Sequence, residues 1–182
     1  EGMKIKDKAQ AAYLFTLDSL RQLREAGADI GMVQLGNETN GSLCGETTWG
    51  NICYLMEGGS RAVRAIFPGA LGAVHFTNPE NADAMRFYAK TLDDFRLDYD
   101  VFATSYYPYW HGTLENLAAV LSQIAEAYGK KVMVAETSYA YTPEDTDSFG
   151  NTIGEGGSYA KPYPLTVQGQ ADAVADVVRT MA

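Results

Sequence analysis

The sequence predicts an α/β fold in which four parallel strands, each followed by a helix, form part of a (β/α) barrel. Helical and extended segments alternate strictly along the 182 residues. The extended segments are almost continuously hydrophobic, which is typical of a parallel sheet covered by helices. Each of them ends in polar or aromatic residues, as strands do at the catalytic edge of a barrel. A doubly wound sheet has the same element order, but no Gly-x-Gly-x-x-Gly motif follows a strand here, which removes the main reason to prefer it.

The first half of the chain supplies three helices and two strands. We expect helices over residues 8–26, 51–66 and 81–96, and strands over residues 31–36 and 70–76. Gly27 and Pro68 each mark the end of a helix, and Asn78-Pro79 ends the second strand. The polar, glycine-rich stretch 39–50 is expected to be a loop.

The second half repeats this alternation. We expect strands over residues 100–106 and 131–135, and helices over 113–128 and from about 168 to the end. The apolar residues of segment 113–128 recur at helical spacing, and Gly129 is a natural stop. Residues 107–112 and 141–166 are expected to be loops, because Gly, Pro, Asp and Ser recur in them.

Composition excludes several classes of protein. The net charge is −9, so the chain should be repelled by nucleic acid and by anionic membrane surfaces. No apolar run approaches the roughly 20 residues of a membrane span. Cys44 and Cys53 allow at most one disulfide, and we expect both to be buried or half-buried. The chain begins without Met and ends within a helical pattern, so we expect it to be part of a longer chain.

Two glutamates stand at the ends of two hydrophobic strands. The run from Met32 ends in Asn37-Glu38, and the run from Val132 ends in Glu136. In a barrel these strand ends share one rim, so the two carboxylates would meet there. Most glycosidases cleave a glycosidic bond with two carboxyl groups, and in retaining enzymes one acts as acid and base and the other as nucleophile. A single glutamate after a strand is more often a solvated loop residue.

Other residues at the same rim suit sugar binding. Asn37 is able to bond a sugar hydroxyl, and His75 is able to bond sugar or either carboxylate. Tyr106 is expected to donate a hydrogen bond to Glu136, which keeps that carboxylate ionised. Trp110 is able to stack on a sugar ring. The alternatives are that His75 is a structural histidine and that Trp110 caps the barrel.

The residues around these glutamates resemble a known family. Asn37-Glu38 and Glu136 are similar to the acid/base and nucleophile signatures of clan A glycoside hydrolases, on barrel strands four and seven. The chain more specifically resembles glycoside hydrolase family 53, the endo-β-1,4-galactanases that cut type I arabinogalactan. The resemblance extends over essentially the whole chain, and four stretches carry it: residues 33–39, 105–113, 134–139 and 169–170.

The resemblance implies the rest of the architecture and the roles of the residues. Residues 1–182 would be a partial catalytic domain that holds about strands 4–7 of a (β/α)8 TIM barrel, without strands 1–3 and 8. Glu38 would be the acid/base and Glu136 the nucleophile, with retention of configuration and no cofactor for catalysis. The substrate would be a polysaccharide, β-1,4-galactan, and the family's action on pectin side chains implies an extracellular or cell-surface location. We expect these 182 residues alone to be inactive. Predicted substrate-binding residues are Asn37, His75, Asn78, Tyr106 and Trp110.

The loop after Glu136 carries a possible metal site. Asp145, Asp147, Phe149 and Asn151 stand at alternate positions, and alternating oxygen donors in a tight loop suit Ca²⁺. The loop is similar to a calcium loop in bacterial members of the family, where His stands in place of Phe149, so a backbone oxygen would serve there. The alternative is a solvated acidic loop.

Two other functions remain open from the sequence. One is a different clan A retaining β-glycosidase, such as a β-galactosidase, mannanase or xylanase, with the same carboxylates and a different cleft. The other is a non-catalytic barrel that only binds glycan. The presence of both Glu38 and Glu136 argues against the second.

Overall fold

The computed structural model describes residues 2–145, 147–150, 152–153 and 158–182. Within them, helices and strands alternate as the sequence predicts. The elements in chain order are α1 (Ile5–Glu25), β1 (Met32–Leu35), α2 (Trp49–Ile66), β2 (Leu71–Phe76), α3 (Ala82–Asp94), β3 (Val101–Ser105), α4 (Leu114–Tyr128), β4 (Lys131–Glu136) and α5 (Val167–Met181). The described helices do not include one that is long and apolar enough to cross a membrane.

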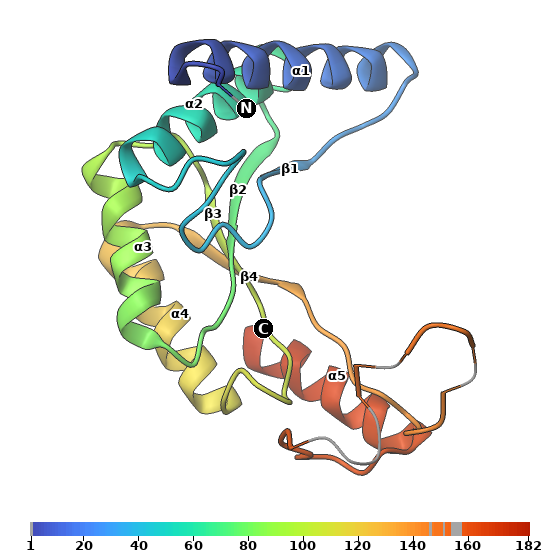
Figure 1. Cartoon of the computed structure of the whole chain (residues 1–182). Helices are drawn as coiled ribbons and strands as arrows, with labels where there is room; N and C mark the ends of the chain where they lie inside the picture. The colour runs from blue at the N-terminus through green and yellow to red at the C-terminus, as the bar shows by residue number, and fades with distance from the viewer. Residues whose placement is uncertain (1, 146, 151, 154–157) are drawn as a thin grey trace.

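The four strands form one parallel sheet in the order β1-β2-β3-β4. Figure 1 shows α2, α3 and α4 following one another in an arc along one side of this sheet, with α1 across its upper end. Neighbouring strands that are also consecutive in the chain, with their helices on one side, are the wall of a (β/α) barrel. All four strands therefore deliver their carboxyl ends to the same edge.

The main core lies between this sheet and the helices. Val74, Phe76 and Phe102 from the strands are fully buried and belong to one hydrophobic cluster with residues of α2, α3 and α4. A smaller cluster, in which Leu20 of α1 meets Leu35 of β1, ties the first helix to the sheet. Both clusters fix the strand positions from the helix side, which leaves the carboxyl ends of the strands available for polar side chains.

The boundaries of the elements differ slightly from the predicted ones. Helix α1 begins three residues earlier than expected, and α2 begins at Trp49. The predicted start of the fourth helix at Thr113 is instead its cap, since the Thr113 hydroxyl accepts from the amide of Asn116 at 3.2 Å. Gly129, at φ 62°, ends that helix as predicted.

The cysteines are both free, and one of them departs from expectation. Cys53 is buried in α2, as expected, but Cys44 is exposed in the loop after β1. The expectation for Cys44 is wrong because this loop runs over the surface instead of packing beneath the helices.

Candidate active site

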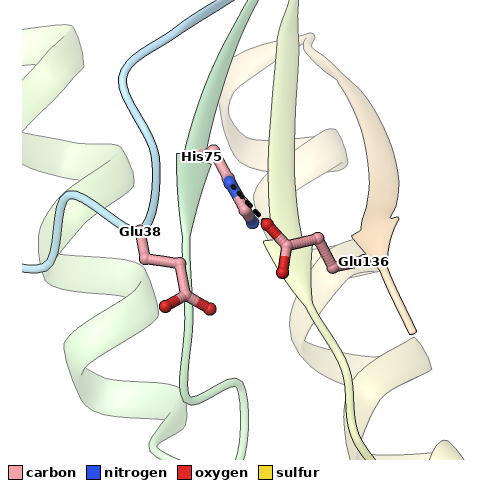
Figure 2. Close-up of side chains that lie close together, drawn as sticks. All are labelled: Glu38, His75 and Glu136. Carbon is pink, nitrogen blue, oxygen red and sulfur yellow. Dashed lines mark ion pairs between the residues drawn. The ribbon is translucent and has the colours of Figure 1, made fainter. Parts of the chain in front are cut away.

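Three ionisable side chains meet at the carboxyl edge of the sheet. Glu38 follows β1, His75 lies within β2 and Glu136 is the last residue of β4. Their nearest oxygen and nitrogen atoms all lie within 4.8 Å of one another. Figure 2 shows Glu38 and Glu136 extending from opposite sides, with the His75 imidazole above and between them and a dashed line joining it to Glu136. The fold therefore brings together the two glutamates that the sequence singled out.

The turn after β1 aims Glu38 at this group. Glu38 itself has φ 45°, in the left-handed region, and Gly36 before it has φ 87°. A Cβ at Gly36 would lie 2.8 Å from the Thr39 side chain, so the turn requires glycine there. The turn is tied to β2, because the amide and hydroxyl of Thr39 both donate to the His75 carbonyl, at 2.8 and 2.9 Å. A left-handed non-glycine residue costs on the order of 1–3 kcal/mol, and such strain is concentrated at functional sites.

Glu38 has a hydroxyl partner that sequence reasoning did not assign. The Ser105 hydroxyl donates to Glu38 Oε1 at 2.7 Å, and His75 Nε2 lies 2.9 Å from the same hydroxyl oxygen. On the other side of the ring, His75 Nδ1 lies 3.1 Å from Gln34 Nε2 and 3.2 Å from Asn37 Oδ1. Ser105 is part of the motif that carries the family resemblance, but nothing in its spacing singled it out from its aromatic neighbours.

His75 is fully buried beneath the two carboxylates. Burial lowers its pKa below the usual value, while the nearby charges of Glu136 and Glu38 act in the opposite direction. The lowered pKa makes His75 a neutral imidazole at neutral pH, with one nitrogen donating and the other accepting.

Glu136 is held by a tyrosine, but not by the predicted one. Tyr107 donates its hydroxyl to Glu136 Oε2 at 2.8 Å, and Oε1 lies 3.8 Å from His75 Nδ1. This hydrogen bond, together with burial, raises the pKa of Tyr107 to about 12, so the phenol stays a donor.

The predicted bond from Tyr106 to Glu136 is wrong. The Tyr106 hydroxyl donates to the Gly112 carbonyl at 3.0 Å, and the side chain is buried in the main hydrophobic cluster. Consecutive residues leaving a strand point to opposite faces, so a shift of one residue moves a side chain from the rim to the core. The strand pairing is irregular at Thr104/Ser105, which sequence periodicity does not reveal.

The other predicted sugar contacts lie around this centre at different distances. Asn37 touches His75 and Gln34 directly. Trp110 is 45% exposed, and its ring meets Tyr107 edge-on at a centroid separation of 6.0 Å. Asn78 is exposed, and its amide donates to Glu80 at 3.1 Å. The roles of these residues toward a sugar stay predictions.

The predicted calcium loop is described in part. The amide of Phe149 donates to Asp147 Oδ1 at 2.7 Å, and the amide of Asp147 lies 3.3 Å from Asp145 Oδ1. Phe149 is 82% exposed, so its side chain leaves the backbone accessible. Asn151 lies outside the described residues. Each of these contacts uses one carboxylate oxygen, Oδ1, of the aspartate, and calcium binding by the loop stays a prediction.

The arrangement at the sheet edge suits a double displacement at a sugar carbon. Retaining glycosidases place their two carboxyl groups about 5–5.5 Å apart, whereas inverting enzymes leave about 6.5–9.5 Å for a water molecule. Oxygens of Glu38 and Glu136 lie within 4.8 Å of each other, which is the closer arrangement. The Tyr107 hydroxyl occupies one oxygen of Glu136 and leaves the other available for attack.

Comparison with known protein families gives a match over the entire chain. The model of "Glycosyl hydrolase family 53" matches residues 1–182. An "Endo-beta-1,4-galactanase" of Bacillus subtilis (strain 168) is 53% identical over 181 residues, covering 100% of this chain and 42% of that protein. An "Arabinogalactan endo-beta-1,4-galactanase" of Cellvibrio japonicus is 31% identical, covering 91% of this chain and 46% of that protein. The chain therefore spans about half the length of the curated relatives that it matches, or less.

Solved structures agree with the sequence comparisons. The Ignisphaera aggregans GH53 catalytic domain superposes with a TM-score of 0.89 at 28% identity, covering 98% of this chain and 51% of that one. A structure from a study of two fungal β-1,4-galactanases superposes with a TM-score of 0.82 at 25% identity, covering 98% of this chain and 55% of that one. A Cellvibrio japonicus xylanase, at 14% identity and a TM-score of 0.61, shares the fold alone. The prediction of a partial (β/α) barrel is confirmed.

Proposed function

This chain belongs to glycosyl hydrolase family 53, and from that premise we propose that the intact protein is an endo-acting galactanase. It would cleave β-1,4-galactosidic bonds in galactan and type I arabinogalactan, with residues 1–182 as part of its catalytic domain. The observation that carries this proposal is that Glu38 and Glu136, which follow the first strand and end the last strand of the sheet, approach each other to within 4.8 Å at its carboxyl edge. The names of the relatives support galactan as the polymer.

The proposed reaction proceeds in two displacements and uses no cofactor. In the first, a carboxylate oxygen of Glu136 bonds to the anomeric carbon while the bond to the leaving oxygen breaks and Glu38 gives that oxygen a proton. In the second, Glu38 takes a proton from water, and the water oxygen replaces Glu136 at the anomeric carbon. Two inversions restore the original configuration. Glu38 ends with its proton and Glu136 as a carboxylate.

The neighbouring side chains have distinct parts in this proposal. Tyr107 holds Oε2 of Glu136 at 2.8 Å, so Oε1 is the oxygen that attacks. Asn37 stands beside Glu38 and bonds a sugar hydroxyl near the cleaved linkage. Trp110 presents an exposed ring beside Tyr107 and stacks on a sugar of the polymer.

The direct test is hydrolysis by the intact protein. We expect reducing ends to be released from linear β-1,4-galactan and not from xylan or mannan, with the product first formed as the β-anomer by proton NMR. Glu136→Ala should abolish release, and azide should restore it with an inverted product. Glu57→Ala removes an exposed glutamate on α2 and serves as the matched control. Full activity of Glu136→Ala would overturn the assignment.

Release from a different polymer would favour the second candidate, another clan A retaining β-glycosidase. The same pair of carboxylates would then act in a cleft of different specificity. Binding of galactan without release, with both glutamates intact, would favour a glycan-binding barrel.

We also propose that the loop after Glu136 binds Ca²⁺ and that the intact protein acts outside the cell or at its surface. Asp145, Asp147, the backbone oxygen of Phe149 and Asn151 would supply oxygen ligands. Removal of calcium with a chelator should lower the melting temperature of the parent protein, and added calcium should restore it. Asp147→Asn should remove most of this response, whereas Asp83→Asn, on the exposed side of α3, should keep it. An unchanged melting temperature in the parent would contradict calcium binding.

A further inference from the structure

A line of polar side chains crosses three strands and ends at Glu38. Gln34 lies on β1, His75 on β2 and Ser105 on β3, and the reaction described above assigns none of them a step. Each lies within 3.1 Å of the next: Gln34 Nε2 to His75 Nδ1, His75 Nε2 to Ser105 Oγ at 2.9 Å, and Ser105 Oγ to Glu38 Oε1 at 2.7 Å. His75 and Ser105 are both fully buried, so water does not substitute for the contact between them, whereas Gln34 at the start of the line is exposed.

The direction of each hydrogen bond follows from the carboxylate. Glu38 Oε1 accepts whether or not the other oxygen carries a proton, so the single Ser105 hydrogen points at it. The Ser105 oxygen then accepts from His75, which places the imidazole hydrogen on Nε2. Nδ1 of the neutral ring is left as an acceptor, and Gln34 Nε2 donates to it. Asn37 Oδ1 lies 3.2 Å from Nδ1 and 3.3 Å from Gln34 Nε2, and in this assignment it accepts from the Gln34 amide and not from the ring. The second hydrogen of that amide donates to the Gly36 carbonyl at 2.8 Å, which identifies the atom facing His75 as nitrogen.

Burial keeps the imidazole neutral against the charged groups around it. Glu38 approaches from the β1 turn and Glu136 from β4, both of which favour a proton on the ring, while burial opposes it and prevails. Tyr107 faces Glu136 as a neutral donor. A second histidine, His111, is buried on the far side of Tyr107 and accepts from the Tyr107 amide through Nδ1 at 3.0 Å.

We propose that Gln34, His75 and Ser105 form a chain of hydrogen bonds in which each residue donates to the next, and that this chain positions Glu38. Ser105 holds Oε1 of Glu38, and Oε2 is the oxygen that gives up and takes up the proton. This inference rests on the proposed function, because it assigns roles for the acid/base step. When Glu38 carries its proton on Oε2, Oε1 still accepts from Ser105. The chain therefore keeps its direction while Glu38 serves first as acid and then as base, and the carboxyl group does not rotate between the two displacements.

The direction of the chain is testable without any activity. In ¹⁵N NMR of the intact protein at neutral pH, His75 should carry its hydrogen on Nε2 and leave Nδ1 unprotonated, as His111 should. Signals are assigned by their loss in His75→Gln. Ser105→Ala should shift the Nε2 signal of His75, whereas Ser60→Ala should not. Ser60 is the matched control, since it is buried and its hydroxyl donates to the Asp98 carbonyl at 2.7 Å, at the other end of the sheet. A hydrogen on Nδ1 of His75 in the parent protein would overturn the proposal.

The effect on proton transfer is measured with aryl glycosides of β-1,4-linked galactobiose. A phenol leaving group needs the acid, whereas 2,4-dinitrophenol does not. Ser105→Ala should lower kcat/KM by about 10- to 100-fold for the phenyl substrate, within the usual contribution of general acid catalysis, and only a few-fold for the dinitrophenyl one. Ser105→Thr, which restores the hydroxyl, should recover most of the loss.

The outcomes separate this inference from the proposed function. Equal losses on both substrates would mean that Ser105 supports the fold and does not position Glu38, which overturns the proposal. A parent protein that cleaves no galactoside would contradict the proposed function, and the tautomer of His75 would still decide the direction of the chain. Melting curves of each variant show whether a loss reflects unfolding.

Discussion

The two ends of the same four strands arrange charged side chains in opposite ways. At the amino ends, Arg64 of α2 donates to both oxygens of Asp98, at 2.9 and 2.8 Å, and to Asp100 at 2.9 Å. Its third nitrogen, Nη1, donates to the Ala70 carbonyl at 2.8 Å, and Asp100 also accepts from the Gly72 amide at 2.7 Å. The hydrogen bond from Arg64 lowers the pKa of Asp98 below its usual value, so opposite charges stabilise each other there.

At the carboxyl ends, two acidic side chains face each other, and their charges repel whenever both are ionised. Glu38 and Glu136 lie within 4.8 Å, and the partners that hold them, Ser105 and Tyr107, are neutral donors. Two unit charges about 4–5 Å apart repel by on the order of 1–4 kcal/mol, depending on how much water screens them. The left-handed backbone of Glu38 adds strain at the same edge.

This difference indicates that the amino ends of the strands stabilise the fold and that the carboxyl ends hold the proposed catalytic pair. At the amino ends, the hydrogen bonds of Arg64 with Asp98 and Asp100 hold β2, β3 and α2 together. At the carboxyl ends, the close approach of Glu38 and Glu136 is unfavourable, and the well-packed core compensates for it. Functional sites commonly cost stability that the rest of the fold supplies. Substitutions at the two ends should therefore change different properties.

The largest effect is expected for Glu136→Ala at the carboxyl end. Turnover of galactan by the intact protein should fall by about 10⁴-fold or more, as for removal of other catalytic nucleophiles. The melting temperature should stay the same or rise, because one of two repelling charges is gone. A large drop in melting temperature would show that the carboxyl end also supports the fold, and the comparison would fail.

Tyr107→Phe should have the next largest effect. Loss of the hydroxyl frees Glu136 Oε2, and the poorly oriented nucleophile should lower kcat by about 10- to 100-fold with little change in KM. Steady-state kinetics on galactan measure both constants. Tyr54→Phe, on the exposed side of α2, should behave as the parent does. A change confined to KM would instead assign Tyr107 to sugar binding.

Arg64→Ala tests the amino end. It removes hydrogen bonds to two aspartates and a carbonyl, and the free energy of unfolding should fall by about 1–3 kcal/mol, measured by urea denaturation. Because Asp98 is largely exposed, we expect the lower part of this range. The rate on galactan should change by less than about 2-fold, as should that of the surface control Arg21→Ala. A loss of activity in the folded Arg64 variant would show that the two ends are coupled.

The smallest effect is expected in the pH dependence of stability. Burial lowers the pKa of both His75 and His111 below the usual histidine value of 6.5. Between the lowered pKa values and 6.5, these histidines bind protons in the unfolded chain but not in the folded one. The free energy of unfolding should therefore fall as the pH drops below 6.5 toward the pKa values of His75 and His111 in the folded protein. Melting temperatures across this range should decline less steeply in His75→Gln than in the parent. Equal slopes would indicate that the fold does not lower the pKa of His75.

The order of the elements and the edge that carries the site were predictable from the sequence. The hydrophobic runs identify the strands, and Gly27, Pro68 and Gly129 mark where the helices end. Together they fix the boundaries of the elements to within a few residues. Since parallel strands share one carboxyl edge, Glu38 and Glu136 had to approach each other once their strands were recognised. The structure confirms that approach.

The identities of the supporting residues were not predictable in the same way. Sequence reasoning chose Tyr106 as the partner of Glu136, where the structure places Tyr107, and it gave no role to Gln34 or Ser105. Periodicity identifies a strand but does not determine which of two consecutive residues at its end turns toward the rim. The irregular pairing at Thr104/Ser105 decides that, and it depends on contacts with β4.

The sequence by itself thus determined the α/β architecture, the edge that carries the candidate site and the two carboxylates there, because these follow from the local pattern of apolar and polar residues along each strand. Only the tertiary structure decided which oxygen of each carboxylate is held and by which donor. Those contacts join β1 to β3 and β3 to β4, and a hydrogen bond between strands depends on register and side-chain direction to within about an ångström. Local sequence carries no such information.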